Sequence, residues 1–234
     1  MKLAIITARG GSKRIPRKNI RNFLGKPILA YSIEAALKSG VFDEVMISTE
    51  DAEIAEIAQR LGAVFPFPRS EQTAGDHAVT IDVMLEVAEE YRKRGRDPEV
   101  VCCLYPTAPF VTAEKLRSAD RLLAESGADA VIPVVRFSYP PQRCFIEQDG
   151  LLKYRWPEYE FARSQDLDPY YHDAGQFYFI RTSVMRAEHT LVPGRTAPLI
   201  LDELEVQDID TDDDWHIAEM KYQRMQSGGS FRPA

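Results

Sequence analysis

Short apolar runs that suit β-strands alternate with segments of helical periodicity along much of the chain. The runs at 3–7, 45–48, 100–104 and 130–135 are rich in Ile, Val, Leu and Ala. Continuous apolar runs of this length are typical of strands buried on both faces, and helical segments between them supply the crossovers of a parallel sheet. The alternation therefore predicts an α/β fold, with a Rossmann-like, mostly parallel sheet and helices on both faces.

Several residues mark the ends of the predicted helices. Gly40 and Gly62 close two of them, because glycine readily adopts the left-handed conformation found at helix C-termini. Thr112 is placed to cap the next helix, and 211–214 has the pattern of a capping box at the start of the last one. With 234 residues, one main domain over 1–225 is expected, and 226–234 is expected to be a disordered tail.

The alternation fails between residues 136 and 171. This segment contains Pro140, Pro141, Pro157 and Pro169 among many aromatic and charged residues. A long segment without the surrounding periodicity is typical of an insertion that projects from a sheet. We expect 136–171 to be a dimerisation arm and the chain to form a homodimer.

Composition excludes several classes of function. A net charge of −7 argues against general nucleic-acid binding, which needs a broad basic surface. No segment approaches the roughly 20 apolar residues that span a bilayer, so no membrane partner is expected. The apolar start ends at Arg9, too early for a signal peptide, and the three cysteines show no disulfide or zinc pattern. These features predict a cytoplasmic protein.

The richest site signal lies just after the first predicted strand. Residues 8–13 read Ala-Arg-Gly-Gly-Ser-Lys, and 17–19 read Arg-Lys-Asn. Glycines let backbone N–H groups turn toward an anion, and the neighbouring cations supply the charge that a triphosphate needs. The spacing matches neither the P-loop nor the dinucleotide fingerprint. The loop is interpreted as a phosphate cradle, with a solvated basic loop as the alternative.

This loop resembles the signature of the CMP-sugar synthetases, the acylneuraminate cytidylyltransferase family, which includes the CMP-sialic acid and pseudaminic acid cytidylyltransferases. It continues along nearly the whole chain at Ser48-Thr49-Glu50-Asp51, Arg69, Thr80, Tyr105-Pro106-Thr107-Ala108-Pro109 and Asp208-Ile209-Asp210-Thr211. It implies a nucleotidyltransferase domain that binds CTP. By this resemblance the nucleotide-binding residues are Ala8, Arg9, Gly10, Gly11, Ser12, Lys13, Lys18, Asn19, Arg69 and Thr80.

Two carboxylates near the C-terminus suggest a metal site. Asp208 and Asp210 are two residues apart, so on an extended segment both would face the same way. Mg²⁺ prefers one or two carboxylates completed by phosphate and water oxygens. The family pattern supports Mg²⁺ as the cofactor. Asp212, Asp213 and Asp214 are instead expected to stabilise the first turn of a helix.

A third cluster predicts the sugar site. Residues 161–167 and 171–178 resemble the pseudaminic acid enzymes, and an arginine fork such as Arg163 can hold a carboxylate. Tyr105 stands where the sialic acid branch tends to carry glutamine. The predicted sugar-binding residues are Tyr105, Arg163, Gln165, Tyr171, His172 and Gln176. For His172 a structural hydrogen-bond pair with its neighbouring aspartate is the alternative.

The resemblance implies a reaction in which the anomeric hydroxyl of an acidic nine-carbon sugar attacks the α-phosphate of CTP. Pseudaminic acid is the expected sugar. Legionaminate, N-acetylneuraminate and 3-deoxy-manno-octulosonate are the alternatives, and a non-catalytic nucleotide-binding regulator is a rival from another class. Positioning and charge neutralisation dominate such chemistry, which assigns catalytic roles to Arg9, Lys13 and Lys18. For the proton of the attacking hydroxyl two routes stay open, Asp210 as the base or a hydroxyl whose own pKa a bound metal lowers.

Overall fold

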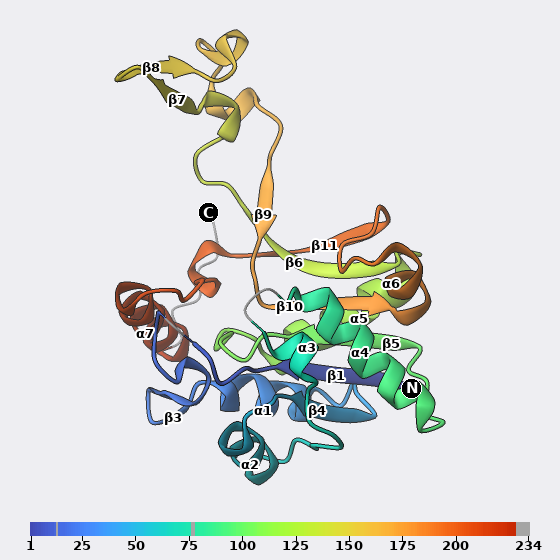
Figure 1. Cartoon of the computed structure of the whole chain (residues 1–234). Coiled ribbons are helices and arrows are strands. Elements are labelled where there is room, and N and C mark those ends of the chain that lie inside the picture. The colour runs from blue at the N-terminus through green and yellow to red at the C-terminus, as the bar shows by residue number, and fades with distance from the viewer. Residues whose placement is uncertain (13, 76–77, 228–234) are drawn as a thin grey trace.

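The computed structural model describes residues 1–12, 14–75 and 78–227, and its centre is one seven-stranded sheet. The strands of this sheet are β1 (Lys2–Thr7), β4 (Glu44–Ser48), β5 (Val100–Leu104), β6 (Ala130–Arg136), β9 (Tyr171–Asp173), β10 (Phe177–Arg181) and β11 (Thr196–Leu201). Their order is β11-β6-β10-β5-β1-β4, with β9 paired to β6 (Figure 1). Two small ribbons, β2 (Asn22–Phe23) with β3 (Lys26–Pro27) and β7 (Phe145–Gln148) with β8 (Leu151–Tyr154), lie outside it.

The predicted, mostly parallel sheet is confirmed. Strands β4, β1 and β5 are parallel to one another, and β11 is parallel to β6. Strand β10 runs antiparallel between β5 and β6, and β9 is also antiparallel to β6. Strand β11 was not expected from the sequence, since Pro198 and its partly exposed pattern hide its strand character.

Helices cover both faces of the sheet, as predicted. They are α1 (Leu29–Ser39), α2 (Ala52–Arg60), α3 (Glu71–Ala74), α4 (Thr80–Lys93), α5 (Ala113–Glu125), α6 (Thr182–Glu188) and α7 (Asp212–Gln226). On one face, α1, α2 and α5 bury Ile33, Ile54 and Leu116 against the sheet. On the other face, α4 and α6 bury Met84 and Met185. No helix in the described part of the chain has the length and apolar character needed to cross a bilayer.

The predicted helix ends are also observed. Thr112 accepts a hydrogen bond from the backbone N–H of Lys115 at 3.2 Å, and Gly40 ends α1 with φ 66°. Thr211 and Asp214 form a reciprocal capping box at the start of α7. The acidic first turn of α7 therefore has a structural role, as expected for 212–214.

A third apolar cluster lies beneath α7 and joins two distant parts of the chain. Ile15 follows β1, Ile209 precedes α7, and each exposes 1% of its surface. Both pack in a cluster with Trp215 of α7 and Phe23 of β2. This packing holds the loop after β1 close to the segment that contains the two predicted metal ligands.

The segment predicted as an arm leaves the sheet between Arg136, the end of β6, and Tyr171, the start of β9. It carries the β7–β8 hairpin and the short 3₁₀ turns η2 (Pro141–Arg143), η3 (Pro157–Tyr159) and η4 (Ser164–Asp166). Figure 1 shows it standing away from the body of the molecule. Phe161 is 90% exposed and Tyr139 87% exposed. Of the expected tail, Gln226 ends α7, and 228–234 lie outside the described residues.

Candidate active site

A cavity of about 680 Å³ opens at the carboxyl end of β1. The loops after β1 and β5, residues within 69–75 and 78–80, and the segment before α7 meet there. This is the edge of the sheet where open α/β folds bind ligands. The cavity is lined by Thr7, Arg9, Ser12, Arg14, Lys18, Asn19, Arg69, Thr73, Gly75, Ala78, Thr80, Val83, Tyr105, Pro106, Thr107, Asp208 and Asp210.

The loop after β1 supplies much of the positive charge in this cavity. Arg9, Ser12, Lys18 and Asn19 all line it, as the sequence interpretation expects of a phosphate cradle. The Asn19 side chain is buried and donates through Nδ2 to the Arg9 carbonyl at 2.8 Å, which fixes the loop on itself. All four residues carry polar or charged side chains that can contact an anion. Lys13, which is also predicted to bind phosphate, lies outside the described residues.

The remaining loop predictions concern backbone positions. Ala8 is fully buried and donates its N–H to the Ser48 carbonyl at 3.1 Å, continuing the pairing of β1 with β4. Gly10 donates its N–H to Glu50 Oε1 at 2.7 Å. Gly11 has no neighbouring atom within 4 Å of an added Cβ. The loop therefore contacts β4 through Ala8 and contacts Glu50, after β4, through Gly10, whereas a Cβ at Gly11 would meet open space.

Asp51 braces the loop from below. A Cβ on Gly10 would lie 2.5 Å from Asp51 Oδ2, so only glycine fits there. Asp51 caps α2 by accepting from the N–H groups of Glu53 and Ile54, both at 3.0 Å, and it pairs with Arg17. The hydrogen bond from Arg17 is the main cause that lowers the pKa of the Asp51 carboxyl. The carboxylate thus joins the start of α2 to Arg17 in the loop after β1.

Arg69 is the most buried cation of the cavity, at 8% exposure. Its Nε donates to Ser48 Oγ at 3.1 Å and one Nη donates to the Ser48 carbonyl at 2.6 Å. Burial lowers the pKa of Arg69, and the charges of Glu50 and Glu86 act in the opposite direction. A guanidinium remains charged in such surroundings, so Arg69 presents a fixed positive charge at the cavity wall.

The two predicted metal ligands line the same cavity. Asp210 pairs with Arg14 at 2.7 Å and lies 3.6 Å from Lys18, whose ammonium also donates to the Ile209 carbonyl at 2.6 Å. Asp208 comes directly before the buried Ile209 in the chain and lines the same cavity. No group of three or more His, Cys, Asp or Glu side chains within residues 1–12, 14–75 and 78–227 is arranged to hold a metal. Two carboxylates still suit Mg²⁺, which keeps several water or phosphate ligands.

A second cavity, of about 570 Å³, adjoins the first. Tyr105, Thr107 and Asp208 line both, so these residues form a shared wall. The Tyr105 hydroxyl lies 3.4 Å from Thr80 Oγ1, and its ring meets that of Tyr178 with centroids 5.7 Å apart. Burial raises the pKa of Tyr105, which keeps its hydroxyl protonated as a hydrogen-bond donor. The second cavity is further lined by Val135, His172, Asp173, Ala174, Gly175, Tyr178, Glu203, Val206, Gln207 and Lys221.

The predicted sugar-binding residues are distributed unevenly. Tyr105 and His172 line the second cavity, and Gln165 lines a separate hollow beside Glu203. Arg163 stands on the arm with its side chain 72% exposed, 2.7 Å from Asp166. The exposed Tyr171 begins β9. Neither Arg163 nor Tyr171 is among the described residues that line the two cavities.

Gln176, also predicted to bind the sugar, is buried and is not among the described lining residues of the two cavities. Its side chain is 2% exposed and donates through Nε2 to the Glu205 carbonyl at 2.8 Å. Its backbone carbonyl accepts from the N–H of Tyr105 at 3.0 Å. Gln176 therefore joins the loop after β5 to the segment after β11, behind the wall that the two cavities share.

Sequence reasoning missed several groups in the second cavity. Lys221 lies on α7 and donates to the carbonyls of Glu203 and Val206 at 3.2 and 2.7 Å, and burial lowers its pKa. The Tyr178 hydroxyl donates to Asp173 Oδ2 at 2.5 Å. Tyr178 could have been found from the alternation of β10, whereas Lys221 reaches the cavity only through the packing of α7.

Comparison with known proteins identifies the family. A cytidylyltransferase family model matches residues 3–196. The chain is 40% identical to a pseudaminic acid cytidylyltransferase of Campylobacter jejuni over 94% of its own length and 95% of that protein. The chain belongs to the cytidylyltransferase family. This membership agrees with the resemblance found in the loop after the first strand.

Two further proteins resemble this cytidylyltransferase, one in sequence and one in fold. A CMP-N,N'-diacetyllegionaminic acid synthase of Legionella pneumophila is 34% identical over 93% of the chain and 94% of that protein. A solved CMP:2-keto-3-deoxy-manno-octonic acid synthetase with CTP superposes with a TM-score of 0.67 and 17% identity, covering 97% of this chain and 99% of that one. At this identity the structural likeness shows the shared fold.

Proposed function

We propose that this cytidylyltransferase transfers CMP from CTP to the anomeric hydroxyl of pseudaminic acid and releases pyrophosphate. The observation that carries the proposal is the shared wall of the two cavities at Tyr105, Thr107 and Asp208. A nucleotide in the first cavity and a sugar in the second would meet there. The choice of pseudaminic acid rests on the relatives at 40% identity.

The first cavity suits a triphosphate and a nucleoside. Arg9, Lys18 and Arg14 supply positive charge, and Ser12 and Asn19 add neutral polar groups. We assign Lys13 to the phosphates as well, as the family resemblance implies. The buried Arg69 and Thr80 are assigned to the cytidine half. Such groups accelerate transfer by positioning the nucleotide and neutralising developing charge.

We propose Mg²⁺ as the cofactor, held by Asp208 and Asp210. When bound, it would neutralise phosphate oxygens and polarise the α-phosphate. Asp210 has to release Arg14 to take this role, since the two side chains pair at 2.7 Å. Arg14 lines the same cavity and can then turn to the triphosphate.

The sugar carboxylate needs a cation that one chain supplies poorly. The second cavity contains the carboxylates of Asp173, Glu203 and Asp208, whereas Lys221 is its one ammonium among the described lining residues. Arg163 carries the planar fork suited to a carboxylate, yet it stands exposed on the arm. We propose that the protein is a homodimer in which the arm of each copy brings Arg163 to the other's sugar cavity.

The exposed side chains of the arm support this assembly. Phe161, Leu151 and Leu152 are at least two-thirds exposed, and large apolar patches of this kind mark interaction sites. Deleting 145–154 should give a monomer by light scattering. A wild-type protein that is monomeric at its working concentration would contradict the dimer.

A cytoplasmic location is also proposed. The cysteines are free, and Cys144 is exposed, which suits a compartment that keeps thiols reduced.

The second candidate substrate is a legionaminic acid, because the Legionella relative is 34% identical.

The proposal is tested by mixing the protein with CTP, Mg²⁺ and each candidate sugar and measuring pyrophosphate and the mass of the product. We expect stoichiometric pyrophosphate and CMP-pseudaminate. Reactions without sugar and with N-acetylneuraminate serve as controls. Failure to form any CMP-sugar would overturn the activity, whereas formation of CMP-legionaminate alone would overturn only the choice of sugar.

A further inference from the structure

Residues in α3 and on either side of it line one wall of the nucleotide cavity, and a single carboxylate outside the cavity contacts this segment. The lining residues are Arg69, Thr73, Gly75, Ala78 and Thr80. Within 69–75 the regular structure is the four-residue helix α3 (Glu71–Ala74). A segment with so little regular structure of its own needs other contacts to hold its shape.

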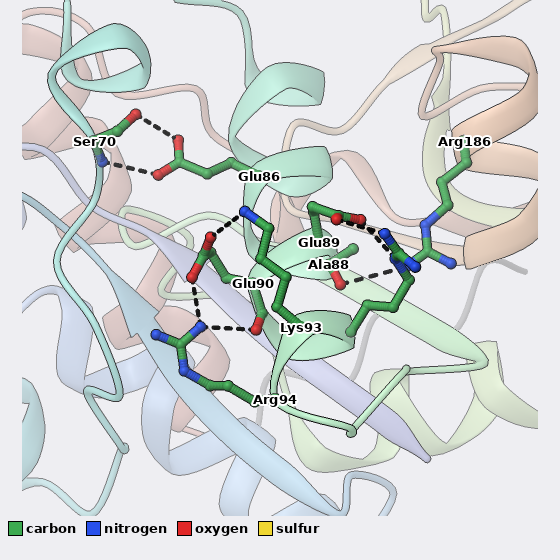
Figure 2. Close-up of polar contacts among 9 residues, drawn as sticks. Ser70, Glu86, Ala88, Glu89, Glu90, Lys93, Arg94 and Arg186 are labelled. Atoms are coloured by element: carbon green, nitrogen blue, oxygen red, sulfur yellow. Dashed lines mark hydrogen bonds and ion pairs between the residues drawn. The ribbon is translucent and has the colours of Figure 1, made fainter.

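Those contacts come from Glu86, on the second turn of α4. Its Oε1 accepts from the backbone N–H of Ser70 at 2.8 Å, and its Oε2 accepts from the Ser70 hydroxyl at 2.9 Å and from the Thr73 hydroxyl. Figure 2 shows Glu86 reaching from the helix across to Ser70. Thr73 is 7% exposed and also lines the nucleotide cavity, so the contact joins Glu86 to a lining residue.

The neighbouring acidic residues of α4 behave differently. Glu90 accepts from Lys93 at 2.9 Å and from Arg94, and Glu89 accepts from Arg92 at 2.7 Å. These partners lie within α4 or at its end, as Figure 2 shows. Glu90 even lines the same outer hollow as Glu86, which makes it a matched control.

We propose that Glu86 is a positioning residue for the nucleotide, acting through Ser70 and Thr73 to hold residues 69–75 of the cavity wall against α4. The inference rests on the proposed function of the cavity as the CTP site. Charge-assisted hydrogen bonds to a carboxylate are the strong class, and three of them converge here. Without them the wall has more freedom, and CTP binding must restore its order.

The test compares CTP dissociation constants by calorimetry for the wild type, Glu86→Ala, Glu86→Gln and Glu90→Ala. Glu86→Ala should weaken CTP about 10-fold and raise KM for CTP, while kcat at saturating CTP changes less than about twofold. Glu86→Gln retains the shape and can still accept from Ser70, so it should recover most of the affinity. Glu90→Ala should bind CTP like the wild type.

A second variant protects the test against a folding defect in Glu86→Ala. Ser70→Ala removes one hydrogen-bond partner of Glu86 at an exposed position. It should weaken CTP binding about threefold and leave the thermal midpoint of unfolding unchanged. In the double variant Ser70→Ala with Glu86→Ala, the two losses of CTP-binding free energy should be less than additive, because both substitutions remove the same interaction.

The outcomes separate this inference from the proposed function. If the wild type does not bind CTP, the proposed function fails. If the wild type binds CTP but Ser70→Ala matches it and Glu86→Ala weakens binding no more than Glu90→Ala, the positioning role of Glu86 is overturned. Reduced stability with an unchanged CTP affinity of the folded protein would also overturn it.

Discussion

Replacing Gly10 with alanine should destabilise the protein through one contact beneath the phosphate loop. The new Cβ would lie 2.5 Å from Asp51 Oδ2, and ordinary contact at 3.4 Å requires a shift of about 0.9 Å. Asp51 resists that shift because it caps α2 with two hydrogen bonds of 3.0 Å and pairs with Arg17. Overpacking of this kind costs about 1–3 kcal/mol. We therefore expect Gly10→Ala to lower the free energy of unfolding by about 2 kcal/mol.

Gly11→Ala is the matched control. No atom lies within 4 Å of its added Cβ, and its backbone is outside the left-handed region. An alanine there should be neutral or should stabilise the protein by up to about 1 kcal/mol, through the unfolded state. The assay is urea unfolding followed by tryptophan fluorescence. In an Asp51→Ala background the cost of Gly10→Ala should largely vanish. Equal stabilities of the two alanine variants would refute the reasoning.

Three further predictions concern the same cavity. Lys18→Ala should lower kcat by about 100-fold or more and cost only about 1 kcal/mol of stability, the value of its bond to the Ile209 carbonyl; urea unfolding and turnover measure the two. Activity should vanish with EDTA and return with Mg²⁺, and the double Asn variant of Asp208 and Asp210 should not respond to Mg²⁺. Because Arg17 lowers the pKa of Asp51, the stability advantage of the wild type over Asp51→Asn should be full above about pH 4 and disappear as the pH falls through the lowered pKa. A stability advantage that does not decline as the pH falls below about 4 would contradict this linkage.

The order of strands and helices could be predicted because each element carries its own local signal. The buried runs of β1 and β5 are apolar throughout, and the caps at Thr112 and 211–214 mark helix starts. Strand β11 carries no such signal, since its stability comes from pairing with β6. The antiparallel direction of β10 likewise depends on the path of the chain and not on local composition.

The candidate site likewise contains residues that a local pattern predicts and residues that only tertiary packing brings together. The cradle residues Arg9, Ser12 and Lys18 are close in sequence, so their pattern alone placed them together. The approach of Asp210 to Arg14 spans 196 positions and depends on the packing of Ile15 and Ile209 under α7. The spacing of these residues in the sequence does not predict such packing. Lys221 and Glu86 escaped notice for the same reason, because each reaches its partner from a helix that the tertiary fold positions.

The central claim is that the second cavity selects pseudaminic acid as the acceptor of CMP. The most direct measurement is the ratio of kcat/KM for pseudaminate to that for N-acetylneuraminate at saturating CTP and Mg²⁺. A site that hydrogen-bonds particular substituents rejects analogues lacking them by up to about 10⁴-fold, whereas an apolar fit discriminates by about 10 to 200-fold. We predict a ratio above about 10³ in favour of pseudaminate. A ratio near one, or a preference for N-acetylneuraminate, would contradict the account.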